Sequence, residues 1–364
     1  MTLWPIECWG LGGFVEQPLG QRMQAEIVEQ VGIALRWSES GGYLDERART
    51  WLAERTPSHV LTFARGTSEN AAAYGRYLLT QHAQMVCLKT EIAQATVLGV
   101  LPHLPGSLAV GISQSGQSPD LVAVASGYRA LGTPVLGIVN DTASPLALES
   151  DHITDIAVGI ESAVAATKSF LAQCLTMLDL VDALSEQRLD REAISRSITD
   201  RCASSEVDGI RQVAAAIRES FARHEGLVMT SRGPDYAVLK EGALKIIETC
   251  ARPVSIYTAT DLEHGPVALV GPHTPVLVTV PGGRFRSSVL SMAEKLQGRT
   301  DRLITVGKGT VPGCYLHIPF DEDDPRALSM AFAVWLQRLT LALSTSMGFD
   351  PDAPHGLEKV TRTL

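Results

Sequence analysis

The sequence predicts an α/β protein in which parallel β-sheets are covered by helices on both faces. Its 364 residues exceed the usual domain size of about 150, so we expect two domains. Apolar strand-like runs alternate with helix-like segments, which is the pattern of parallel sheets. Aromatic residues make up only 5% and there are 31 glycines, which favours layers of small side chains over an aromatic-rich β-sandwich.

An internal repeat organises the chain. Residues 59–79 read as an apolar strand, an Arg-Gly pair with polar neighbours and an Ala-rich helix, and residues 226–246 repeat this order. In each half a second strand follows and ends in a glycine turn, at Gly116 and at Gly283. The two pairs of motifs stand at the same interval along the chain. We infer two copies of one α/β unit.

The segments around the repeat complete this organisation. Residues 23–55 look like two helices, and the first 22 residues, which have no clear periodicity, are either disordered or an arm packed on a neighbour. The predicted domains are a leader at 1–22, N-terminal helices with the first unit at 23–190, a helical linker at 191–222, the second unit at 223–345 and a C-terminal tail at 346–364.

Composition argues against several functions. The net charge is −9 and no basic run interrupts it, so nucleic acid is not expected as a partner, although a local cradle of N–H groups still suits a small anion. The six cysteines are scattered without zinc spacing, which indicates reduced thiols in a cytoplasmic protein. We expect neither a membrane span nor a signal peptide.

A serine-rich turn follows the second strand of the first unit. Residues 113–118 read Ser-Gln-Ser-Gly-Gln-Ser and precede a helix that begins at Pro119. Helix N-termini and short hydroxyl side chains bind phosphate, but Ser118 could equally be an N-cap in a tight turn. Thr67 and Ser68 favour a phosphate pocket, because they follow the preceding strand and neighbouring strand ends meet at one edge of the sheet.

The second unit carries charged residues instead. Its corresponding turn, residues 281–284, lacks the hydroxyl cluster. Glu241, Lys245 and Glu248 lie at i, i+4 and i+7, on one face of the predicted helix. This spacing is also typical of a solvated salt-bridge ladder, but the apolar neighbours favour an embedded face. His264 follows in a turn-rich loop, which presents a side chain rather than packing it.

Together these motifs resemble the sugar isomerase (SIS) domains of the glucosamine-6-phosphate synthase family. The resemblance rests on RGTS at 65–68, SQSGQSPD at 113–120, VAATKSF at 164–170, EGALKIIE at 241–248, EHGPVAL at 263–269 and DPDAPHGLEKV at 350–360. It runs in order from about Met23 to the C-terminus. It implies two flavodoxin-like SIS domains in a homodimer that acts on hexose 6-phosphates.

The resemblance also implies roles for individual residues. Glu248 is implied as the base that moves a proton between C1 and C2. His264, which the family lends from the other subunit, would open the sugar ring, and Lys245 and Lys359 would lie in the same site. The implied contacts are Thr67, Ser68, Ser113, Gln114, Ser115 and Ser118 for the phosphate, and Val164, Ala165, Ala166 and Glu241 for the rest of the substrate. No metal or organic cofactor is implied.

Departures from the synthase pattern bear on the reaction. Thr2 follows Met1, Cys8 is internal and only residues 1–22 precede the SIS part, so we do not expect the glutamine-hydrolysing cysteine of the synthase. Ala166 stands where the synthase has serine, and VAATKSF is closer to stand-alone SIS deaminases. We therefore predict a glucosamine-6-phosphate deaminase that yields fructose 6-phosphate and ammonia.

Two alternatives stay open at this point. One is a deaminase, isomerase or deglycase for a related compound such as galactosamine 6-phosphate or a fructosamine 6-phosphate, because epimer choice rests on a few contacts. The other is a non-catalytic sugar-phosphate-binding regulator, since fold alone does not fix function. A regulator would not need the catalytic residues implied above, Glu248, His264 and Lys359. A measurement of ammonia release distinguishes an enzyme from a regulator.

Overall fold

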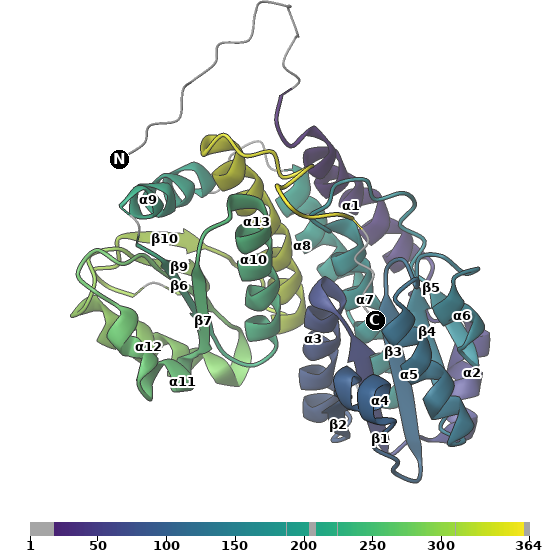
Figure 1. Ribbon diagram of the computed structural model, residues 1–364. Coiled ribbons are helices and arrows are strands. Elements are labelled where there is room, and N and C mark those ends of the chain that lie inside the picture. The colour runs from purple at the N-terminus through teal and green to yellow at the C-terminus, as the bar shows by residue number, and fades with distance from the viewer. Residues whose placement is uncertain (1–17, 187, 204–208, 224, 310, 360–364) are drawn as a thin grey trace, which may run out of the picture.

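The described residues form two parallel five-stranded sheets, one from each half of the chain (Figure 1). The computed structural model describes residues 18–186, 188–203, 209–223, 225–309 and 311–359. The strand orders are β2-β1-β3-β4-β5 and β10-β9-β8-β6-β7. Counted within each half, both are 2-1-3-4-5, the order of flavodoxin-type sheets. The two halves therefore share one strand order, which is consistent with the repeat predicted from the sequence.

The central strands are long apolar runs because helices cover both of their faces. In β3 every residue is buried, which explains the unbroken pattern LAVGI. The first sheet contains β1 (His59–Ala64), β2 (Val86–Lys89), β3 (Ser107–Ser113), β4 (Val135–Val139) and β5 (His152–Asp155). The second contains β6 (Leu227–Ser231), β7 (Val254–Thr258), β8 (Val276–Val280), β9 (Leu303–Gly307) and β10 (Leu316–Pro319).

The helices alternate with the strands, as the pattern predicted. The first half contains α1 (Gln21–Glu39), α2 (Glu46–Arg55), α3 (Gly66–His82), α4 (Ile92–Leu98), α5 (Pro119–Ala130), α6 (Pro145–Leu148) and α7 (Lys168–Leu184). The second contains α8 (Arg191–Ala203), α9 (Ile210–Ala222), α10 (Pro234–Cys250), α11 (Ala259–Glu263), α12 (Arg286–Gln297) and α13 (Pro325–Ser346), with 3-10 turns η1 (Pro266–Leu269) and η2 (Gly283–Phe285). The two helices expected before the first strand are α1 and α2.

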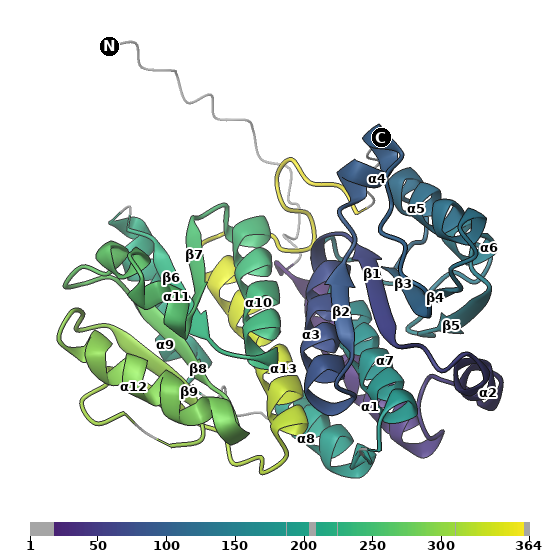
Figure 2. The same ribbon diagram turned by 90° about the horizontal axis from the view of Figure 1, so that it is seen from below.

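A layer of long helices lies between the two sheets (Figures 1 and 2). One continuous hydrophobic core joins α3, α7, α10 and α13 to the inner faces of both sheets, for example at Val110 and Met229. The outer faces have cores of their own, with α5 and α6 on the first sheet and α11 and α12 on the second. Within the central layer α3 packs against α10, which joins the two halves of the chain.

The segment predicted as a linker is helical but takes part in the core. Its apolar residues recur at i, i+4 spacing, with Ile194 and Ile198 on α8 and Val213 and Ile217 on α9. All four are fully buried in the shared core. This segment therefore supports the helix layer, as an amphipathic helix does in a globular protein.

Three further expectations concern the ends and the composition. The predicted leader falls mostly on residues 1–17, which lie outside the described residues. Among the described helices α13 is long and apolar enough to cross a membrane, but 83% of its most apolar window is buried inside the protein, as in a core helix. The cysteines within the described ranges are free: Cys87, Cys174, Cys202, Cys250 and Cys314.

Candidate active site

A cavity of about 400 Å³ opens where the carboxyl edge of the first sheet meets α10 and the C-terminal tail. Most of the site residues predicted from the sequence line it: Thr67, Ser68, Ser113, Gln114, Ser115, Ser118, Val164, Ala166, Lys245, Glu248 and Lys359. They come from distant parts of the chain and meet here because α3 packs against α10. The cavity is of the size that a small polar ligand occupies.

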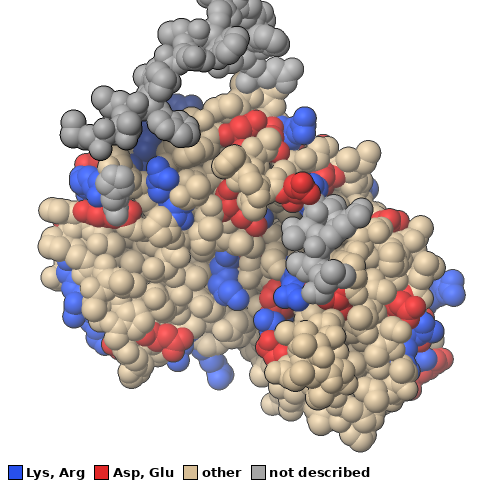
Figure 3. Space-filling view, in the orientation of Figure 1, with Lys and Arg blue, Asp and Glu red and all other residues tan. Residues whose placement is uncertain are grey.

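Two helices begin at the wall of this cavity. α3 begins at Gly66, directly after β1, and α5 begins at Pro119, after β3. The first N–H groups of a helix lack partners within the helix and carry the positive end of its dipole. Acidic and basic side chains are mixed on the face in Figure 3, so a phosphate group bound in this cavity would be attracted by such local donors and not by a large basic surface.

The serine turn between β3 and α5 is closed by its own side chain. Ser113 Oγ accepts a hydrogen bond from Gly116 N at 3.0 Å. Gly116 has a φ of +62°, and a Cβ there would lie 2.1 Å from Ser144 Oγ, so the turn requires glycine. Ser118 is the N-cap residue of α5, but its hydroxyl makes no capping hydrogen bond. The alternative that Ser118 serves only as an N-cap is therefore not favoured.

Lys245 lies between two carboxylates of its own helix, α10. Its Nζ donates to Glu248 Oε2 at 2.5 Å and lies 3.5 Å from Glu241 Oε1. Burial acts to lower the pKa of Lys245, but the two carboxylates outweigh burial and raise it. Lys245 is therefore an ammonium group at neutral pH, and it supplies a fixed positive charge next to Glu248.

Glu241 stands behind the cavity wall and links the two halves of the site. Its Oε1 accepts from Thr67 Oγ1 and its Oε2 from Asn70 Nδ2, both at 2.8 Å. Burial raises the pKa of Glu241, although Lys245 and the two hydrogen bonds oppose this. Through these bonds α10 is tied to the start of α3, where the candidate phosphate pocket begins. The predicted contact of Glu241 with substrate stays a prediction.

The C-terminal tail brings Lys359 to another wall of the cavity. Lys359 Nζ donates to Glu161 Oε2 at 3.0 Å and to the Ala163 carbonyl oxygen at 2.6 Å. The tail is anchored at Asp352, whose carboxylate accepts from the backbone N–H groups of Arg22 and Met23, both at 2.8 Å. The loop after β5 and the tail therefore meet over the cavity.

Two other predicted residues do not line this cavity. Ala165 is completely buried between its neighbours Val164 and Ala166, which do line it. His264 is exposed just after α11, on the second half of the chain. A catalytic His264 therefore requires a second copy of the chain, as the resemblance implies, and its role stays a prediction.

The structure adds three charged residues to the cavity wall, Arg65, Glu161 and Glu358. Arg65 lines the cavity, and its guanidinium donates to Asp120 Oδ2 at 2.7 and 2.9 Å. Because Arg65 directly precedes Gly66 in the RGTS motif, the sequence could have indicated that it belongs to the site. Glu161 also lines the cavity, but it lies in a loop without periodicity and gave no signal. No group of three or more His, Cys, Asp or Glu side chains in the described ranges could hold a metal ion.

Comparison with known proteins agrees with this geometry. The SIS domain family model matches residues 55–181. A glutamine–fructose-6-phosphate aminotransferase (isomerizing) of Caulobacter vibrioides is 30% identical over 319 residues, which cover 84% of this chain and 52% of that protein. The corresponding protein of Thermosynechococcus vestitus is 31% identical and covers 83% of the chain and 51% of its own length. The chain thus spans about half the length of these curated relatives.

Solved structures share the arrangement of both halves. A Silicibacter pomeroyi protein assigned as a phosphosugar isomerase has a TM-score of 0.79 and 29% identity, over 91% of this chain and 99% of its own. The C-terminal domain of glucosamine-fructose-6-phosphate aminotransferase from Francisella tularensis has a TM-score of 0.77 and 25% identity, over 92% and 98%. A Thermotoga maritima glucosamine-6-phosphate deaminase, at 22% identity and a TM-score of 0.74 over 94% and 100%, shares the fold. The chain therefore contains a SIS domain at residues 55–181.

Proposed function

We propose that the protein is a glucosamine-6-phosphate deaminase, which converts an amino sugar 6-phosphate to fructose 6-phosphate and ammonia. One observation carries this proposal. A single cavity joins the hydroxyl-lined turn and two helix N-termini of the first half to the Lys245–Glu248 pair of the second. We take the second sheet as a second SIS domain, because it repeats the strand order of the first.

The proposed chemistry is a proton transfer followed by hydrolysis. With the sugar ring open, C1 is an aldehyde and C2 carries the amine. Glu248 removes the C2 proton and returns it to C1, while the C1 oxygen gains a proton and the nitrogen loses one. C1 then carries a hydroxyl group and C2 is an imine. The Lys245 ammonium stabilises the negative charge that develops on the C1 oxygen. Water then adds to the imine, and C2 becomes the ketone as ammonia leaves.

One residue of the cavity wall supports the proposal that the reaction runs toward ammonia release. Ala166, which the resemblance associates with stand-alone deaminases, lines the cavity beside Val164. Alanine lacks the hydroxyl group of serine, and we propose that the space is used by water, the co-substrate of imine hydrolysis. The curated relatives are aminotransferases, and this chain spans about half of their length. Their isomerase step would share the proton transfer proposed for Glu248.

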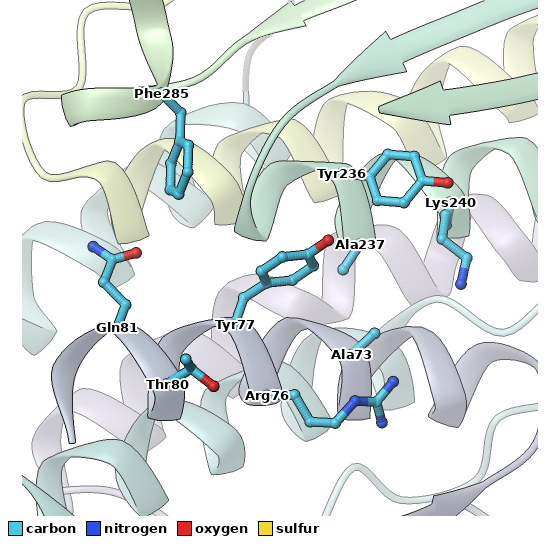
Figure 4. Close-up of a pocket in the computed structure, with 9 residues that line it drawn as sticks. All are labelled: Ala73, Arg76, Tyr77, Thr80, Gln81, Tyr236, Ala237, Lys240 and Phe285. Carbon is cyan, nitrogen blue, oxygen red and sulfur yellow. The ribbon is translucent and has the colours of Figure 1, made fainter. Parts of the chain in front are cut away.

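We also propose that a second copy of the chain completes the site by lending His264. β2 is an edge strand with Val86 and Leu88 exposed by 52% and 41%, and exposed apolar edge strands are normally covered. Beside it a groove of about 630 Å³ runs between α3 and α10, where Tyr77 and Tyr236 face the space between the helices (Figure 4). β2, α3 and α10 lie on one face (Figure 2).

Asp261, on α11 and three residues before His264, acts on the two tyrosines of this groove through its charge. Burial raises the pKa of Tyr77 and of Tyr236, and the carboxylate of Asp261 on α11 adds to both shifts. The backbone N–H of His264 donates a hydrogen bond to the carbonyl oxygen of Asp261, at 3.1 Å. A second copy seated on this face would therefore approach α11 and His264 directly.

The test is ammonia release from a panel of substrates. The purified protein is incubated with glucosamine 6-phosphate, galactosamine 6-phosphate, a fructosamine 6-phosphate and, as the matched control, unphosphorylated glucosamine. We expect ammonia and fructose 6-phosphate in equal amounts from glucosamine 6-phosphate, and neither from glucosamine. If the protein released ammonia only from another sugar phosphate of the panel, that compound would be its substrate. Phosphate-dependent binding without turnover of any member would make the protein a regulator.

A further inference from the structure

Glu161 is a buried carboxylate that the proposed reaction does not use. It lies in the loop between β5 and α7, and its side chain is completely buried at the cavity wall. Oε1 accepts from the backbone N–H groups of Thr167 and Ser169, at 3.0 and 3.1 Å. Oε2 accepts from Ser169 Oγ at 2.7 Å and from Lys359 Nζ at 3.0 Å. The start of α7 therefore fixes the carboxylate, and one of its oxygen atoms is directed at Lys359.

The charge state of Glu161 fits this arrangement. Burial acts to raise the pKa of Glu161, but Lys359 and the hydrogen bonds from Ser169 and Thr167 outweigh it, and the pKa is lowered. The carboxylate is thus ionised at neutral pH and sits opposite the Lys359 ammonium. A buried ion pair of this kind is held only when hydrogen bonds satisfy its other lone pairs, as they do here.

Lys359 makes two hydrogen bonds at the cavity wall. Its ammonium has three N–H donors, and two of them go to Glu161 Oε2 and the Ala163 carbonyl oxygen. Among the described residues the third N–H has no hydrogen-bond partner, so it is available to a group in the cavity, which Lys359 lines. Without Glu161 this long, flexible side chain, which is 25% exposed, keeps only the hydrogen bond to the Ala163 carbonyl oxygen and loses its charged partner.

We propose that Glu161 is a positioning residue, which holds the Lys359 ammonium in the cavity so that its remaining donor meets the oxygen or nitrogen at C1 and C2 of the substrate. This inference rests on the proposed function for its substrate. The contact between Glu161 and Lys359 does not depend on the proposed function, and the experiments below test the contact and the function separately. Glu161 acts through Lys359 and need not touch the substrate.

The decisive experiment is a double-mutant cycle of Glu161→Gln and Lys359→Met on the full chain. Glutamine keeps an oxygen for the N–H groups of Thr167 and Ser169 but places an NH2 group where Lys359 needs an acceptor. We expect Glu161→Gln to lower kcat for glucosamine 6-phosphate about 10- to 100-fold, as small misplacements of reacting groups do. In the Lys359→Met background we expect it to change kcat less than about twofold, because the two residues act as a unit.

Glu26→Gln is the matched control. Glu26, on α1, accepts from the N–H groups of Ser162 and Ala163 in the same loop and acts on Lys359 only through its charge, without a hydrogen bond. It should change kcat by the same factor with and without Lys359. If Glu161→Gln also behaves additively, its role is to support the loop, and the proposal is overturned.

Amide hydrogen exchange of residues 355–359 tests the contact without turnover. Both Glu161→Gln and Lys359→Met should speed this exchange about tenfold, and Glu26→Gln should not. Unchanged exchange in Lys359→Met would overturn the proposal even if Glu161→Gln failed to fold. If the wild-type protein released no ammonia, the proposed function would fail, and exchange would still decide whether Glu161 holds Lys359.

Discussion

The two lysines of the cavity differ because their surroundings differ. Lys245 is 3% exposed and lies between two carboxylates of one helix, so its charge is fixed by α10 itself. Lys359 is held by Glu161, which lies 198 residues away in the sequence. The i, i+4 spacing on α10 predicted the partners of Lys245 from the sequence. No local pattern connects Lys359 with Glu161, so this pair required the structure.

Asp235, in the first turn of α10, predicts a pH-dependent stability. Burial raises its pKa to about 7, against the opposing hydrogen bond from Ser329. The folded state therefore keeps the proton up to about pH 7, whereas the unfolded chain loses it near pH 4. The stabilisation from this group is complete at low pH and is lost as the pH rises through that window.

Asp235→Asn isolates this contribution. We expect the free energy of unfolding of the wild type, minus that of the variant, to fall between pH 4 and pH 7 by at most about 1.4 kcal/mol per pH unit. Urea unfolding of both proteins at pH 5, 6, 7 and 8 measures the difference. A difference that is constant with pH would show that Asp235 is not protonated in the folded state.

At the scale of elements, α1 obtains its N-terminal cap from the other end of the chain. Its N-cap residue is Gly20, which has no side chain to offer. Asp350 accepts from Gly20 N at 3.0 Å, and Asp352 accepts from Arg22 N and Met23 N. These bonds join residues about 330 positions apart. Helix α1 was predictable from its apolar periodicity, but a cap supplied by a distant segment leaves no local signal.

Asp352→Ala should therefore destabilise the whole protein. Loss of a capping carboxylate costs about 0.5 to 2 kcal/mol, and we expect the upper half of this range because Asp352 bonds two N–H groups. Glu358→Ala, at an exposed position of the same tail, is the control and should stay within about 0.5 kcal/mol of the wild type. Denaturant unfolding compares them, and equal stabilities would argue against the cap.

At the scale of the molecule, one helix layer serves both sheets and places the candidate site between the two halves. The sequence predicted both units, the turn at the end of β3 and the charged face of α10. It did not predict how the units dock, because the Thr67–Glu241 bond depends on α3 packing against α10. That contact is set by the shapes of two apolar helix faces, which a pattern of residue types does not specify.

Shared sites between two copies predict complementation. Glu248→Gln and His264→Asn homodimers should both be inactive, because each site loses one of its groups. In a mixed dimer one site carries both lesions and the other carries neither. A statistical mixture should therefore recover about one quarter of the wild-type ammonia release. Co-expression with two purification tags measures this, and an inactive mixed dimer would mean that His264 and Glu248 of different copies do not share a site.

The central claim is that the first half holds the phosphate while Glu248 performs the chemistry. Binding of glucosamine 6-phosphate and release of ammonia, measured on the same preparation of Glu248→Gln, test it most directly. We predict a dissociation constant within about threefold of the wild type, since the phosphate contacts remain, and ammonia release lower by about 10² to 10⁴. Ammonia release at the wild-type rate, with binding intact, would contradict the claim.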